Sequence, residues 1–252
     1  MKKKIIIVAV ITILLFLSMT FSSVQAAVVG TRYYTSGSTF DIRGILDNGY
    51  ELSTTYSNGG YTVILNVDGN TAQMGTSGSV EKNGVSLTLS STSDGNLTFN
   101  LKNSTTEQKN VKVSVDADIM LGGNDSAALY KNGHSSISIT QDNEGIANYG
   151  AQVVINFAPE VTTSWIGPYY DRTGNRYVDG TVMAYTYASR VDTGLAFSWQ
   201  MDLAPEENKQ FGTAYAAQEA TRAVAKADGE VYANVLLGGT VTTPSLPANP
   251  EG

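Results

Sequence analysis

Apolar and small polar residues alternate along much of the middle of the chain. Val85, Leu87 and Leu89, for example, alternate with Ser86 and Thr88. The same alternation recurs in residues 97–101, 111–115, 137–139, 153–157 and 195–199. Because successive side chains of a strand point to opposite faces, each segment predicts a strand with one buried face and one polar face.

Glycine and asparagine clusters separate these segments, at residues 58–60, 68–70, 82–84 and 94–96. Such residues readily adopt the positive φ that tight hairpin turns require. Many short strands joined by tight turns favour antiparallel sheets packed in two layers. We therefore predict an all-β fold, an antiparallel two-sheet β-sandwich, in preference to a small closed barrel.

A different pattern near the C-terminus predicts one short helix. Residues 216–227 are rich in Ala, Gln, Glu, Arg and Lys, and Asp228-Gly229 supplies a stop signal. One further strand is expected at residues 230–237. Residues 240–252 contain three prolines and no hydrophobic segment, which is typical of an extended linker or a disordered tail.

The N-terminus resembles a bacterial secretory signal. Three lysines follow Met1, residues 5–17 are apolar, and Val24-Gln25-Ala26 matches a cleavage site with small residues. The apolar run is shorter than the roughly 20 residues that cross a bilayer. We therefore predict a signal peptide over residues 1–26, a β-sandwich domain over 27–239 and a Pro-rich linker or tail over 240–252. The mature protein is expected to be secreted, outside the cell or at its surface, without membrane insertion after cleavage.

Composition and charge exclude several classes of protein. The chain has no cysteine, so disulfides and thiolate metal sites are excluded and stability must come from core burial. Without the three leader lysines, 13 basic residues remain against 23 acidic ones, a net charge of about −10. Nucleic acids and anionic membrane surfaces are therefore poor partners for the mature chain.

Four segments between about residues 116 and 216 have a distinctive order. They are residues 118–127 (DIMLGGNDSA), 164–172 (SWIGPYYDR), 192–200 (DTGLAFSWQ) and 203–207 (LAPEE). In these segments the chain resembles a β-sandwich domain of secreted, surface-attached multidomain proteins of Firmicutes. That domain has Pro-Gly-Glu in a tight turn where this chain has Pro205-Glu206-Glu207. The resemblance implies a secreted surface module without an assigned chemistry.

The candidates for nucleophilic or zinc catalysis are weak. His134 is the one histidine of the chain, so a Ser-His-acid triad would have to use it. No strand-to-helix turn with a G-x-S-x-G motif accompanies it. One histidine without cysteines also cannot build the usual zinc site. We expect His134 to be a surface loop residue and predict no catalytic residue.

Paired carboxylates are the remaining route to hydrolysis, because a glycosidase needs two of them across a sugar. The acidic candidates show no diagnostic spacing, and most lie in settings typical of turns. They are Asp116, Asp118, Asp125, Asp142, Glu144, Glu160, Asp171, Asp179 and Asp192. A carbohydrate-active enzyme of sandwich fold that uses an acidic pair therefore stays as the alternative function.

Calcium is the one cofactor that the residues favour, because it binds clustered carboxylate and amide oxygens on irregular loops. Asp116 and Asp118 point to the same side of a predicted strand, and Asn124-Asp125 follows a Gly-Gly turn. We predict either no cofactor or a calcium ion at Asp116, Asp118, Asn124 and Asp125. The acidic segment 171–179 lacks the EF-hand spacing and holds two arginines, so it is expected to be a polar hairpin.

Aromatic residues concentrate in one stretch of the sequence. Exposed rings of this kind stack on sugars or contact protein partners. The candidate ligand-binding residues are Trp165, Tyr169, Tyr170, Tyr177 and Tyr185, with Tyr187 nearby. The alternative is that these rings pair across strands and stiffen a sheet. Trp199 lies on an apolar face and is expected in the core.

Two function hypotheses follow from these observations. The first is a secreted, non-catalytic surface or cell-envelope module with a structural, adhesive or binding role, whose partner is an extracellular glycan or a cell-surface protein. The second is the carbohydrate-active enzyme. Two carboxylates about 5 to 10 Å apart in a concave site favour the enzyme. A flat or convex tyrosine surface without such a pair favours the module.

Overall fold

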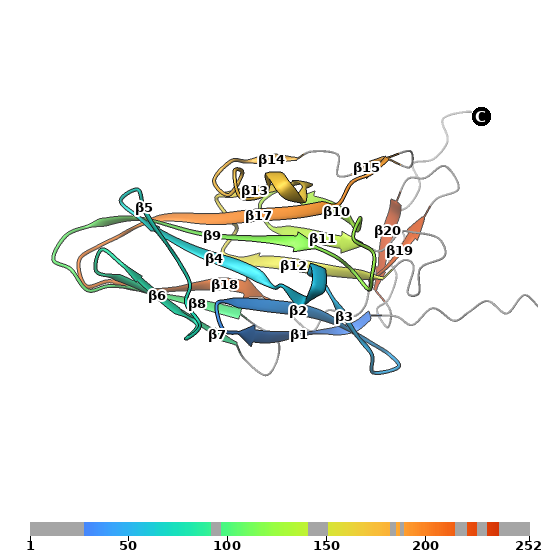
Figure 1. Cartoon of the computed structure of the whole chain (residues 1–252), viewed down its shortest axis with the longest axis horizontal. Coiled ribbons are helices and arrows are strands. Elements are labelled where there is room, and N and C mark those ends of the chain that lie inside the picture. The colour runs from blue at the N-terminus through green and yellow to red at the C-terminus, as the bar shows by residue number, and fades with distance from the viewer. Residues whose placement is uncertain are drawn as a thin grey trace, which may run out of the picture.

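The computed structural model describes residues 28–91, 97–140, 151–181, 185–186, 189–214, 221–225 and 231–236. These residues form almost entirely strands, arranged as two large sheets that pack against each other (Figure 1). The predicted all-β sandwich with antiparallel sheets is therefore confirmed. In the described part of the chain, no helix has the length and apolar character needed to span a membrane.

The first sheet, here called sheet A, has nine strands. Its main path runs, in order, through β1 (Val28–Ser36), β2 (Thr39–Leu46), β4 (Tyr61–Val67), β9 (Lys109–Ile119), β17 (Thr193–Leu203), β13 (Thr163–Pro168) and β14 (Gly180–Thr181). Off this path, β3 (Glu51–Ser53) pairs with β2 and β5 (Asn70–Gln73) pairs with β4. Neighbouring strands are antiparallel, except that β14 joins β13 in parallel.

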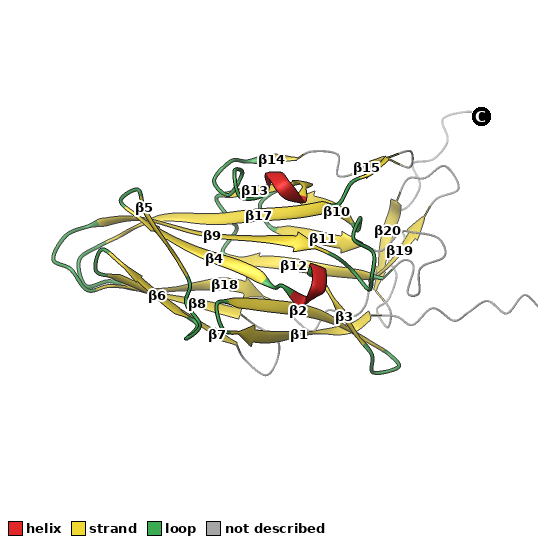
Figure 2. Ribbon diagram, in the orientation of Figure 1, coloured by secondary structure: helices red, strands yellow, loops and turns green. Residues whose placement is uncertain are grey.

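The second sheet, here called sheet B, has seven strands. Its order is β10 (Ala128–Asn132), β11 (Ser136–Thr140), β12 (Gln152–Ala158), β18 (Asn208–Ala214), β8 (Leu97–Asn103), β7 (Val85–Ser91) and β6 (Ser79–Lys82). Two short helical turns, η1 (Tyr56–Asn58) and η2 (Tyr169–Asp171), complete the sandwich (Figure 2). Two further strand pairs are formed by β15 (Tyr185–Thr186) with β16 (Ser189–Arg190), and by β19 (Thr221–Ala225) with β20 (Val231–Leu236).

The alternating segments form the strands that they predict. The apolar residues at 85, 87, 97, 99 and 101 are buried, as are those at 111, 113 and 115. Trp199 is 2% exposed and lies in the core as expected. Its ring lies 5.0 to 5.9 Å, centroid to centroid, from the rings of Phe99, Phe157, Phe197 and Phe211. The hydrophobic core is therefore built from the inner faces of both sheets.

Two of the predicted tight turns are present as hairpin turns. Asp68 and Gly69 have φ values of 51° and 85° between β4 and β5, and Asn83 and Gly84 have φ values of 49° and 77° between β6 and β7. Two consecutive positive φ angles give the turn twist that suits a two-residue hairpin. The expected turn at residues 94–96 lies outside the described residues.

The predicted C-terminal helix is wrong where it can be compared. Thr221–Ala225 forms β19, which pairs antiparallel with β20. The rest of the predicted helix, residues 216–220 and 226–227, lies outside the described residues. An adjacent strand offers backbone hydrogen bonds that outweigh a helix preference of a few tenths of a kcal/mol per residue. The strand expected at residues 230–237 is confirmed as β20.

Candidate functional site

A segment of the chain covers the outer face of sheet A. After β13, residues 169–179 turn back over β17 and β9, and η2 contacts both strands. Gly194 lies directly beneath this segment, since a Cβ atom built there would come 2.7 Å from the Cα of Tyr169. A side chain at this position would push the segment away from the sheet. The small residue therefore allows the close approach that shapes the site.

The pairing register of β9 with β17 places two acidic residues beneath and beside the covering segment, residues 169–179. Asp116 lies opposite Ala196 and Asp118 lies opposite Gly194. Both side chains point away from the core, because the residues between and beside them are buried in it. The neighbours of the two carboxylates differ, however, and divide the site into two ends.

The first end, here called the arginine end, is formed by Asp116, Arg172 and Arg176. The Nε of Arg176 donates a hydrogen bond to Asp116 Oδ2 at 2.5 Å, and the Nε of Arg172 lies 3.5 Å from Oδ1. The Asp116 side chain is 2% exposed. Asp116 is therefore a buried carboxylate that is neutralised by two guanidinium groups from the covering segment.

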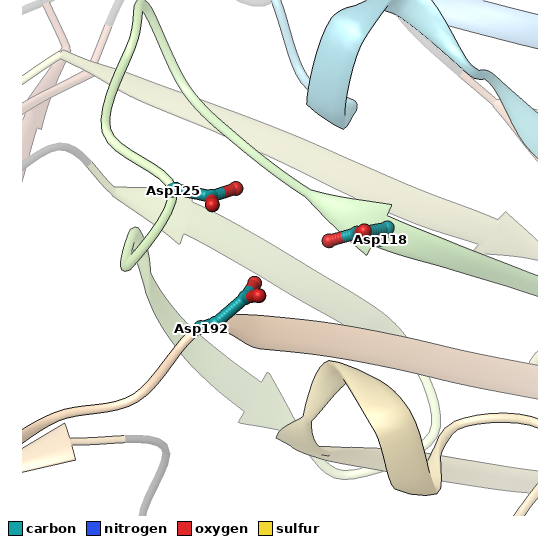
Figure 3. Close-up of side chains that lie close together, drawn as sticks. All are labelled: Asp118, Asp125 and Asp192. Atoms are coloured by element: carbon teal, nitrogen blue, oxygen red, sulfur yellow. The ribbon is translucent and has the colours of Figure 1, made fainter.

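The second end, here called the acid end, is formed by Asp118, Asp125 and Asp192 (Figure 3). One carboxylate oxygen from each residue lies within 4.8 Å of the other two. Asp118 comes from the end of β9, Asp125 from the following loop, and Asp192 from the residue before β17. Three separate segments thus bring three carboxylates to one point.

Local turns and backbone hydrogen bonds hold these segments together. The chain reverses at Gly122 and Gly123, which both have positive φ, and Leu121 and Asn124 exchange backbone hydrogen bonds of 3.0 and 3.1 Å. The backbone carbonyl of Asp125 accepts a hydrogen bond from Thr193 N, at 3.3 Å. The geometry of the acid end is therefore set by the main chain.

Burial raises the pKa of all three carboxyl groups, and repulsion between carboxylates adds to the shift of Asp118 and Asp192. For Asp192, burial and then the charges of Asp118 and Asp125 raise the pKa to about 6. For Asp118, burial raises the pKa while the nearby Arg172 guanidinium opposes the shift. Burial also raises the pKa of Asp125. The acid end is therefore a cluster in which ionised carboxylates are not fully compensated by the protein.

Each of the three residues also has a covered oxygen without a partner. The Oδ1 atoms of Asp118, Asp125 and Asp192 are all buried and make no hydrogen bond within the described residues. A buried carboxylate oxygen without a partner is costly unless it is protonated or binds a cation. Ca²⁺ takes six to eight oxygen ligands at about 2.3–2.6 Å and accepts irregular geometry, so the three carboxylates fit part of a calcium shell.

Of the four residues predicted as calcium ligands, two lie together at the acid end. Asp118 and Asp125 lie together, but Asp116 is engaged by the arginines. Asn124 is buried, and its side-chain oxygen accepts a hydrogen bond from Ser126 N, at 3.0 Å, that closes the turn. Asp192 is one of the acidic candidates from the sequence, but it is not among the predicted calcium ligands. Only the pairing of β17 with β9 brings it beside Asp118.

The predicted aromatic residues do not share one exposed surface. Trp165 is 4% exposed and its ring packs over Gly167, so it offers no ring to a ligand. Tyr170 is 66% exposed, and Tyr169 packs edge-on against it at 5.9 Å between ring centroids. Tyr177 is half-buried above β9. The side chain of Tyr185 and the whole of Tyr187 lie outside the described residues.

His134 belongs to a structural cluster at the edge of the sandwich. Its Nε2 lies 3.2 Å from Asp179 Oδ2, and Lys131 Nζ lies 2.8 Å from Asp179 Oδ1. The hydrogen bond from Lys131 is the main cause that holds the pKa of Asp179 well below its usual range. Lys131 also donates to the carbonyl of Ser164, at 2.6 Å. These contacts fasten sheet B to β13. In the described part of the chain, no serine hydroxyl bonds to His134, so no Ser-His-acid triad is formed there.

Among the described residues, no other acidic candidate joins the acid end. Glu160 and Asp171 are exposed, and Asp142 and Glu144 lie outside the described residues. The chain was also compared with models of known protein families and with curated proteins, and it matches none of either.

Proposed function

We propose that this protein is a secreted, non-catalytic module of the cell surface or envelope, and that its acid end binds a calcium ion. The observation that carries the proposal is the meeting of three covered carboxylate oxygens, one each from Asp118, Asp125 and Asp192, without hydrogen-bond partners. The signal peptide predicted over residues 1–26 supports a location outside the cell. Calcium there is abundant enough to fill sites of modest affinity.

Calcium at the acid end would give three segments one shared ligand. Asp118 belongs to β9, Asp125 to the loop after it, and the backbone carbonyl of Asp192 accepts a hydrogen bond from Tyr169 N, at 2.9 Å. Tyr169 in turn packs against the exposed Tyr170. The bound ion would therefore fix the position of η2 and of the Tyr170 ring, which is suited to contact a glycan or a protein partner.

The carbohydrate-active enzyme remains a second candidate because of one observation. A carboxyl group with a pKa of about 6, as at Asp192, beside two other carboxyl groups is typical of an acid-base pair in glycosidases. Against it, one oxygen of each acid is covered, and the carboxylates crowd within 4.8 Å. That separation is shorter than the roughly 5–9.5 Å used to place a sugar or a water between two carboxyls.

Calcium titration by isothermal calorimetry of the chain from residue 27 onward tests the metal site. We expect one calcium ion per chain, a weaker response to magnesium, and loss of binding in both Asp118→Asn and Asp192→Asn. Asp171→Asn is the matched control, because it removes an exposed carboxylate of the covering segment outside the acid end. Absence of calcium binding in a protein that melts cooperatively would contradict the metal site.

Binding to a glycan array and to isolated cell walls, with calcium and with a chelator, tests the module. Selective binding that is lost in Tyr170→Ala and weakened by the chelator supports recognition through η2. Release of reducing sugar from any bound glycan, lost in Asp192→Asn, would favour the enzyme instead. Recovery of the protein from culture medium with a new N-terminus near residue 27 would support secretion.

A further inference from the structure

The outer face of sheet B carries a second feature that is separate from the acid end. Strands β7, β8 and β18 lie side by side in this sheet. Their outward residues align in two rows across the strands, because the register is continuous. The rows are Ser86, Lys102 and Asn208, and then Thr88, Asn100 and Gln210. Every side chain in both rows carries a hydroxyl, amide or ammonium group.

A groove of about 370 Å³ follows these two rows. Its volume lies at the lower end of the range of about 300–1,000 Å³ that is typical of ligand sites. Of the residues between the rows, Leu87 and Leu101 are buried in the core, whereas Lys209 is half-buried and also lines the groove. The floor of the groove is therefore a rigid sheet, and its polar groups are positioned by backbone pairing.

Most of these polar side chains have no partner among the described residues. Asn100 donates a hydrogen bond to Ser90 Oγ, at 3.2 Å. Within the described residues, the side chains of Ser86, Thr88, Lys102, Asn208 and Gln210 make no hydrogen bond or ion pair. Hydroxyl and amide groups both donate and accept, so two such rows match the many hydroxyl groups of a sugar chain.

The charge of the groove indicates which class of sugar it is suited to bind. Lys102 of β8 and Lys209 of β18 both line the groove, and among the described residues no acidic one does. The chain as a whole has a net charge of −7. A positively charged groove is complementary to an anionic ligand even on an acidic protein. Among the described residues, no carboxylate within the groove would repel the ligand. We propose that this groove binds an anionic glycan, a sugar chain that carries carboxylate or phosphate groups.

Among the described residues, no aromatic one lines the groove. Hydrogen bonds and the Lys102 charge would therefore supply the binding, without the stacking of rings that many sugar sites use. Such binding weakens with added salt. The groove lies on sheet B, away from the calcium ligands on sheet A, so this proposal does not rest on the proposed function.

Affinity electrophoresis and calorimetry of the chain from residue 27 onward test the proposal with three probes: a polyuronate, a phosphate-containing polyol polymer and a neutral glucan. We expect at least one anionic polymer to bind at least fivefold more tightly than the neutral one. The polyuronate and the phosphate polymer distinguish which anionic group the groove prefers. Binding should persist in a chelator and in Asp192→Asn, so a failure of the calcium site leaves this result unchanged.

Matched variants locate the binding. Lys102→Gln should weaken it about tenfold, as expected for loss of a charge-assisted hydrogen bond, and Lys102→Arg should restore most of it. The double variant Thr88→Ala/Gln210→Ala should weaken it further. The controls are Lys112→Gln and Thr71→Ala/Gln73→Ala, which remove the same groups from sheet A. All substitutions at exposed positions should leave the melting temperature nearly unchanged.

Three results would overturn the proposal. The first is no binding of any polymer by a folded protein. The second is equal binding of the neutral and anionic polymers, which would remove the role of charge. The third is equal loss of binding in Lys112→Gln and Lys102→Gln, which would show attraction by overall charge instead of a groove.

Discussion

Asp116 and Asp118 are neighbours on the same face of β9, yet the charged groups around them have opposite signs. Asp116 meets two arginines, whereas Asp118 meets two further carboxyl groups. At the arginine end opposite charges are already paired, although the buried Nε of Arg172 makes no hydrogen bond within the described residues. The acid end has an excess of negative charge and covered oxygens without partners. The difference indicates that the first end serves stability and that the second end is suited to hold a cation.

The largest expected effect lies at the arginine end. Asp116→Asn removes the buried carboxylate that Arg172 and Arg176 share. We expect a loss of about 3 kcal/mol in the free energy of unfolding, as for other broken buried ion pairs. Urea denaturation measures it, with Asp171→Asn as a control of the same chemistry at an exposed position. A loss below about 1 kcal/mol would show that the arginine end contributes little.

The acid end should respond to calcium instead. Calcium at 100 times its dissociation constant should raise the free energy of unfolding by about 2.7 kcal/mol. For a domain of this size, the melting temperature should then rise by about 5–10 °C. Thermal melts with and without a chelator measure the shift. The same rise in Asp118→Asn, or no rise in the unaltered protein, would contradict a metal site at these residues.

Without calcium, the acid end should make the protein less stable as pH rises. The folded-state pKa of Asp192 is about 6, above the value of about 3.9 for an unfolded aspartate, so the folded state binds the proton more tightly. The resulting stability is fully present below about pH 4 and is lost as pH rises through about 6. Because the group is partly exposed, we expect a change of about 1 kcal/mol between pH 5 and pH 7 in a chelator.

Asp192→Asn provides the control for this pH effect. The variant should lose most of the dependence and, in a chelator at pH 7, should be as stable as the unaltered protein or slightly more stable. With calcium present, the order should reverse, because the ion binds the ionised carboxylates. An unchanged pH profile in Asp192→Asn would assign the dependence to another group.

The smallest effect is expected at the rim of the arginine end. The Tyr177 hydroxyl lies 3.5 Å from Ser114 Oγ, at the limit of a hydrogen bond, and its ring lies 5.2 Å from Lys112 Nζ. Tyr177→Phe keeps the ring contact and removes the hydroxyl. We expect a loss below about 0.5 kcal/mol. A larger loss in urea denaturation would show that Tyr177 helps to position the covering segment.

Much of the fold could be predicted because its signals are local. Alternation in residues 97–101 and 111–115 depends only on the pleat of a strand, and the positive φ of Asn83-Gly84 depends only on those two residues. The helix expected over residues 216–227 failed at β19 for the opposite reason. Its composition favours a helix locally, but pairing with β20 depends on a second segment.

The candidate site was predictable to the same extent. The sequence by itself determined that β9 presents Asp116 and Asp118 on one face, since side chains two residues apart on a strand point the same way. It also placed Asp125 near them through the Gly122-Gly123 turn. Only the tertiary structure decided which carboxylate would be neutralised. The covering segment brings arginines to Asp116, and the register of β17 brings Asp192 to Asp118. Coulomb interactions depend on distance in space, and here distances in space depend on strand pairing that no local pattern encodes.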